Sequence, residues 1–64
     1  MSLPHNTPPR IGQKFQYFGA VIEFAKVGDF AFFENIYYFR FLHDGRVVVF
    51  QPSEFANLNL KALT

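Results

Sequence analysis

The sequence predicts a small, mainly β domain that is built from five short strands. Apolar residues alternate with polar ones in several short stretches, and a period of two is typical of half-buried strands. Runs dense in aromatic and β-branched residues flank Asp44-Gly45, which is a strong local signal for a β-hairpin. Glycine and proline punctuate the chain between these stretches, so turns are expected there.

The chain divides into a tail and one domain. Residues 1–10, MSLPHNTPPR, contain three of the four prolines and show no periodicity, so we expect a flexible, Pro-rich tail. Residues 11–64 have the length of a single small β-barrel domain with one small core.

Two strands are expected before residue 28. Residues 11–19, IGQKFQYFG, alternate Phe15 and Tyr17 with polar neighbours, and residues 20–27, AVIEFAKV, place Ile22 and Phe24 on one face. Gly19 separates the two stretches. It predicts either a tight turn or a bend within one long strand.

The stretch from Ile36 to Gln51, IYYFRFLHDGRVVVFQ, predicts the central hairpin. If its loop has two residues, His43 faces Arg46 and Phe39 faces Phe50. One face then forms a core from Tyr37, Phe39, Phe41, Val48 and Phe50. The other face carries Tyr38, Arg40, Leu42, Val47, Val49 and Gln51, which is unusually apolar for a solvated surface. A three-residue loop would exchange Val47 and Val49 for Val48 and Phe50.

A helix over roughly residues 30–42 is the competing prediction, and it would give an α+β fold. Asp29 is a possible N-cap and Gly45 a possible stop signal. The aromatic and β-branched composition, and the lack of a single apolar stripe, favour a strand instead.

The last part of the chain predicts one helical turn and one strand. Pro52 ends the preceding strand, and Ser53 can start a short turn of helix. Residues 57–63, NLNLKAL, alternate Leu58, Leu60 and Ala62 with polar residues, which is typical of a short amphipathic strand.

This order of elements over roughly residues 12–63 resembles a small SH3-like barrel, and a five-stranded OB-like barrel fits nearly as well. The resemblance concerns the fold pattern, and no family motif accompanies it. Such barrels include peptide binders, RNA-binding rings and enzyme accessory subunits, so the resemblance by itself implies no single function.

Composition excludes several kinds of site. With no Cys and only two His, we expect no metal site and no cofactor. The net charge is +1 with the signs interspersed, so no basic tract is present to follow duplex nucleic acid. No stretch is long and apolar enough to span a membrane or act as a signal peptide, which makes a cytoplasmic protein with no membrane partner the expectation.

The sequence also predicts that the protein is not an enzyme. His43-Asp44 could be interpreted as a catalytic dyad, but adjacent turn residues rarely reach that geometry and no nucleophile lies near. Glu23, Glu34 and Glu54 could supply an acid and a base, yet nothing fixes their spacing.

Thirteen aromatic rings are more than so short a chain can bury, so an apolar surface patch is expected. Our leading hypothesis is an interaction module that binds a protein partner or itself as a homo-oligomer. Its predicted partner-binding residues are Tyr38, Arg40, Leu42, Val47 and Val49, with Arg40 at the rim.

Two alternatives remain open. The first is a single-stranded nucleic-acid binder, in which exposed aromatic rings including Phe32 and Phe33 stack on bases. Its predicted binding residues are Tyr37, Tyr38, Arg40 and Arg46. The second is an accessory subunit of a larger enzyme complex, which the sequence does not separate from the leading hypothesis.

Overall fold

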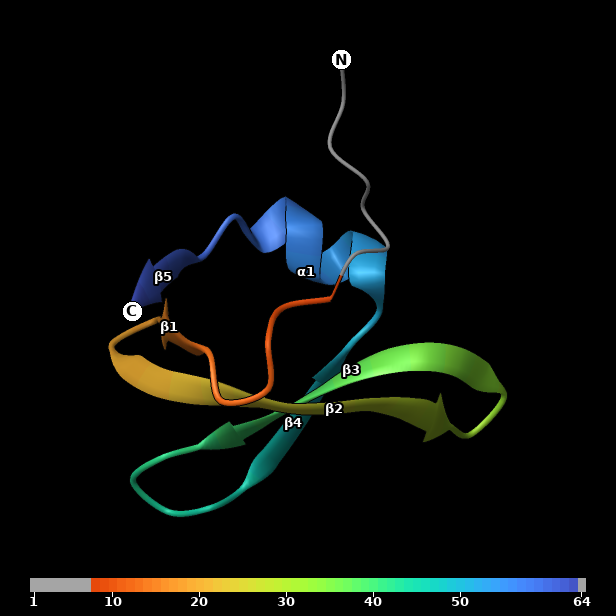
Figure 1. The fold of residues 1–64 in the computed structure, drawn as a ribbon, viewed down its shortest axis with the longest axis horizontal. Coiled ribbons are helices and arrows are strands. Elements are labelled where there is room, and N and C mark those ends of the chain that lie inside the picture. Colours follow the sequence, from red (N-terminus) through yellow and green to blue (C-terminus); the bar gives the residue numbers. More distant parts are fainter. Residues whose placement is uncertain (1–7, 64) are drawn as a thin grey trace.

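Five antiparallel strands form one sheet in the computed structural model, which describes residues 8–63 (Figure 1). The larger part of the predicted tail, residues 1–7, lies outside the described residues. The elements in chain order are β1 (Lys14–Tyr17), β2 (Ala20–Phe30), β3 (Phe33–Phe41), β4 (Val47–Phe50), α1 (Pro52–Leu58) and β5 (Lys61–Leu63). The mainly β prediction is therefore confirmed.

The strands are ordered β4-β3-β2-β1-β5 across the sheet. The first four strands form a meander, and α1 then leads the chain back so that β5 pairs with β1. The strands β4 and β5 lie at opposite edges and do not pair with each other, so the sheet is not closed and the predicted barrel is not confirmed.

A tight turn joins β1 and β2. This is one of the two structures that Gly19 predicted, and the bend within one long strand is wrong. Tyr17 pairs directly with Ala20, so the turn consists of Phe18 and Gly19. Both turn residues have positive φ, 46° and 83°, which is the requirement of a type I′ hairpin turn.

The long β2–β3 hairpin occupies the region where a helix was the alternative, so the helix over residues 30–42 is wrong. Phe30 pairs with Phe33 across a turn formed by Ala31 and Phe32, and the hairpin extends beyond the rest of the sheet (Figure 1). The sequence predicted that the second strand ends at residue 27, but β2 continues to Phe30. Its pairing with β3 shifts register between Gly28 and Phe30.

The β3–β4 hairpin forms around Asp44-Gly45, but with a longer loop than we assumed. The amide of Phe41 donates to the carbonyl of Arg46 at 2.7 Å, and Gly45 donates to the carbonyl of Phe41 at 2.8 Å. Phe39 therefore pairs with Val48 instead of Phe50. Because the slip is two residues, every side chain keeps its predicted face.

Helix α1 is longer, and β5 shorter, than the sequence predicted. Pro52 occupies the first turn, where a missing N–H costs nothing, and Gln51 and Glu54 form a capping box. The helix ends at Asn59, whose φ of 51° is left-handed. The predicted strand over residues 57–63 is thus correct only for Lys61–Leu63.

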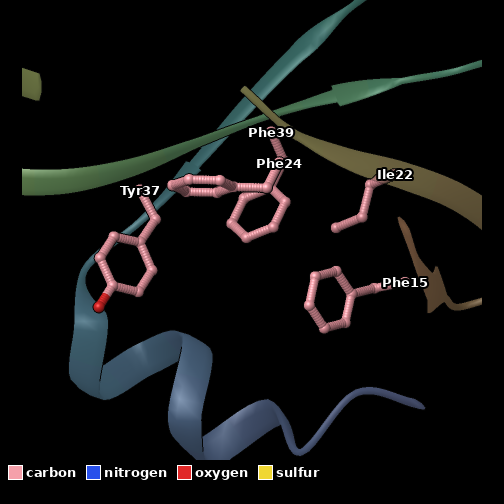
Figure 2. Close-up of a cluster of buried hydrophobic side chains, with 5 residues drawn as sticks. All are labelled: Phe15, Ile22, Phe24, Tyr37 and Phe39. Carbon is pink, nitrogen blue, oxygen red and sulfur yellow. The ribbon is translucent and has the colours of Figure 1, made fainter. Parts of the chain in front are cut away.

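Aromatic rings fill the space between one face of the sheet and α1. The buried residues of this core are Phe15, Ile22, Phe24, Tyr37 and Phe39, which Figure 2 shows. Phe55 of α1 stacks on Phe39 with ring centroids 5.0 Å apart and meets Phe15 edge-on at 5.2 Å. A short helix with one large ring therefore covers the core.

Candidate interaction surface

The centre of the sheet face opposite the core carries a row of charges. Glu23 of β2 accepts a hydrogen bond from Arg40 of β3 at 3.0 Å and lies 3.7 Å from the ammonium of Lys14 in β1. Strand register fixes this row, which runs Val47, Arg40, Glu23, Lys14 and Leu63 across all five strands. The guanidinium of Arg40 is thus already paired.

Tyr38 lies in the next row of the same face and is half-buried. Its hydroxyl donates to the backbone carbonyl of Asp29, and the ammonium of Lys26 lies 5.0 Å from its ring centroid. The cation occupies the position that a stacking base would need, so Tyr38 is engaged within the chain.

The β3–β4 loop holds a second set of paired charges. The carboxylate of Asp44 accepts from the Arg46 amide at 3.0 Å and from its Nε at 2.8 Å. These contacts hold the pKa of the Asp44 carboxyl below its ordinary value. His43 Nε2 lies 3.4 Å from the same carboxylate in an exposed loop, an arrangement that supports the turn and brings no nucleophile near it.

Four of the predicted partner-binding residues are neighbours on β3 and β4, and the fifth, Leu42, lies just after the end of β3. Val47 is exposed beside Arg40, while Val49 is half-buried beside Tyr38. Leu42 is exposed at the far end of β3, next to Val21 and His43. Val47 and Val49 lie two residues apart on the same face of β4 and are therefore neighbours, with Arg40 beside Val47 toward the centre of the sheet.

The residues of the nucleic-acid alternative are not brought together. Tyr37 belongs to the core, where Figure 2 shows its hydroxyl directed toward α1, and burial raises its pKa. Arg40 and Arg46 are both paired with carboxylates. Of these four residues, only Tyr38 and Arg40 share the sheet face opposite the core, which is called the outer face below.

Exposed aromatic side chains gather instead at the end of the β2–β3 hairpin. The ring of Phe32 is 100% exposed, and those of Phe30 and Phe33 are 50% and 51% exposed. The turn between the strands starts at Ala31 with a φ of 56°, a conformation that usually selects glycine. These three phenylalanines are referred to below as the hairpin-end cluster.

An apolar groove of about 260 Å³ adjoins this cluster. Phe30 and Phe33 of the hairpin line it together with Gln51 and Glu54 of the β4–α1 junction. Its remaining lining residues are Ile36, Val49 and Phe50. Val49 is therefore the residue that the groove shares with the predicted patch.

Sequence reasoning missed the groove and the role of Phe30. The signal was the stretch FAFF at residues 30–33, which places aromatic rings where a polar turn is normal. It was overlooked because Ala31-Phe32 has none of the residues that identify a turn.

No catalytic or metal constellation stands out in the described part of the chain. Glu23 is paired within the charged row, Glu54 caps α1, and Glu34 lies on the exposed part of β3. Residues 8–63 contain no group of three or more His, Cys, Asp or Glu side chains that could hold a metal ion. The same residues include no helix of the length and apolarity needed to cross a membrane.

Comparisons with protein-family models, with curated proteins and with solved structures find no match to this chain.

Proposed function

We propose that the protein is a non-enzymatic interaction module that binds a protein partner through the hairpin-end cluster and the adjoining groove. The observation that carries this proposal is the complete exposure of Phe32, flanked by two half-exposed rings, at the end of a projecting hairpin. The proposal moves the binding surface from the centre of the outer face to one end of it, with Val49 common to both.

The size of the cluster supports a binding role. The exposed fractions of Phe30, Phe32 and Phe33 add up to about two whole rings, or roughly 300–500 Å² at about 150–250 Å² per ring. The largest apolar patch on a typical monomer covers about 300–600 Å² and is often functional. Three side chains on this chain reach that range by themselves.

Charge supports a protein partner over a nucleic acid. Seven residue steps along β3 separate Phe33 from Arg40, roughly 20 Å of strand. The cation nearest to the cluster in sequence is Lys26, and its ammonium already lies 5.0 Å from the Tyr38 ring. Asp29 and Glu34, both exposed, flank the cluster and would repel phosphates. An accessory subunit of a larger enzyme complex would be one form of the proposed module.

Affinity capture with matched variants tests the proposal. Immobilised wild-type protein, Phe32→Ser and Phe18→Ser are compared. Phe18 is the matched control because it is also an exposed turn aromatic, 81% exposed, but lies in the β1–β2 hairpin. We expect proteins retained from extract by the wild type and Phe18→Ser to be lost with Phe32→Ser. Retention of the same proteins by all three would refute binding through the hairpin end.

A further inference from the structure

We propose that the occupant of the hairpin-end surface is a second copy of this chain, with the Phe32 ring of each copy inserted into the groove of the other. This inference rests on the proposed function and names its partner. It accounts for the presence of both a projecting ring and an apolar groove on one small surface.

The ring and the groove belong to the same patch. Phe32 stands in the turn between Phe30 and Phe33, and these two neighbours line the groove. In a dimer with twofold symmetry the same patch of each copy contacts the other, so a patch must complement itself. A projecting ring directly beside a groove meets that requirement. The two ring-in-groove contacts then form within one dimer and leave no ring or groove free for a third copy.

The size of the groove suits a side chain. Its volume of about 260 Å³ lies below the roughly 300–1,000 Å³ of small-molecule pockets. Five of its seven lining residues are apolar, and the other two are Gln51 and Glu54. A single aromatic ring matches this mostly apolar lining.

The available area sets the strength of the contact. The hairpin-end clusters of two copies supply about 600–1,000 Å², twice the 300–500 Å² of one copy, and this area already includes Phe30 and Phe33 of the groove. Stable interfaces bury about 1,200–2,000 Å². We therefore expect a dimer that dissociates on dilution.

Charge favours a second copy over a lipid surface. Each chain carries a net charge of only +1, so two copies repel each other weakly. The exposed carboxylates of Asp29 and Glu34 flank the cluster, whereas hairpins that enter anionic membranes benefit from flanking cations.

Sedimentation velocity over a dilution series tests the inference, and a mixing experiment makes the test specific. Phe32→Ser removes the ring and Val49→Glu places a charge in the groove, so each variant alone loses both contacts of the symmetric dimer. A mixture of the two restores one contact, from the Phe32 of the Val49→Glu copy to the intact groove of the Phe32→Ser copy. Circular dichroism checks that each variant is folded.

We expect the wild type and Phe18→Ser to dimerise, with association weakened on the order of 100-fold or more in Phe32→Ser. Val49→Glu should also be monomeric, and the mixture should recover part of the dimer. If Val49→Glu fails to fold, Phe32→Ser and the Phe18→Ser control still decide the matter.

Three results would overturn the inference. A wild type that is monomeric at every concentration, or a dimer insensitive to Phe32→Ser, refutes the second copy as occupant. Monomeric protein that pellets with neutral phosphatidylcholine vesicles through Phe32 assigns the surface to a membrane instead. A monomer that still captures other proteins through Phe32 overturns only this inference, whereas a monomer with no such capture overturns the proposed function too.

Discussion

Replacing Phe39 by alanine should destabilise the fold strongly, whereas replacing Phe32 by alanine should hardly change its stability, although both residues belong to the β2–β3 hairpin. Phe39 is fully buried, and its ring contacts those of Phe15, Phe24 and Phe55 at centroid distances of 5.9, 5.3 and 5.0 Å. Phe32 is fully exposed. Because both variants replace phenylalanine by alanine, the difference between their losses of stability reports the effect of burial.

The expected size of the effect follows from the size of the domain. Phe39→Ala should cost about 3–5 kcal/mol through lost burial and the cavity that remains. At roughly 0.05–0.15 kcal/mol per residue, a 64-residue chain has only about 3–10 kcal/mol to lose. Phe32→Ala should stay within about 0.5 kcal/mol.

Thermal unfolding followed by circular dichroism measures both variants. At about 4–8 °C per kcal/mol, Phe39→Ala should lower the Tm by roughly 12–40 °C. Dilute protein is used so that any dimer does not contribute. Phe39→Leu keeps most of the apolar volume and should cost less, which leaves a measurable transition if the alanine variant does not fold. Equal losses for Phe39→Ala and Phe32→Ala would refute the assignment of the core.

Three further predictions concern backbone strain and titration. Ala31→Gly should raise the free energy of unfolding by about 1 kcal/mol, because a φ of 56° is strained for alanine. Gly19→Ala should lower it, because Gly19 has a φ of 83°, although no atom would clash with the added methyl group. Urea titration measures both changes. Tyr37→Phe should be neutral or stabilising by up to about 1 kcal/mol, because the buried hydroxyl has no hydrogen-bond partner among the described residues. Since the pKa of Tyr37 is raised in the folded state, the wild type should lose stability above about pH 10, and the variant should lose less. The lowered pKa of the Asp44 carboxyl stabilises the fold above about pH 4, and this stabilisation is lost as the pH falls. The Tm of Asp44→Asn should therefore fall less steeply between neutral and acidic pH than that of the wild type. An unchanged slope of Tm against pH would contradict this.

Local sequence was enough to predict the strands and the core face. Positive φ at Gly19 suits the turn that its position indicated, and the aromatic composition of residues 33–41 correctly favoured a strand over a helix. The assumed loop at Asp44-Gly45 was too short, yet the side-chain faces survived because the slip was even.

Long-range register decided what local sequence did not. The residue of β2 that faces Arg40 is set by the two-residue turn at Ala31-Phe32, because the two register shifts of this hairpin offset each other before Glu23 pairs with Arg40. Local sequence did not indicate that turn, so it did not predict the Glu23–Arg40 ion pair. The sequence named Phe32 and Phe33 as exposed aromatics for the nucleic-acid alternative, but it did not indicate that a turn brings Phe30 beside them, since Ala31-Phe32 adopts its turn without glycine or asparagine.

The pairing of β1 with β5 has a consequence for the order of folding. Each other strand pair joins neighbours along the chain, whereas Lys14 and Leu63 meet only after nearly the whole sequence has been brought back on itself. The meander should therefore form first, and β5 should dock last and detach first. Amide hydrogens between β1 and β5 would then exchange with solvent faster than those between β2 and β3, and each detachment would leave β1 briefly open to strand exchange with another copy.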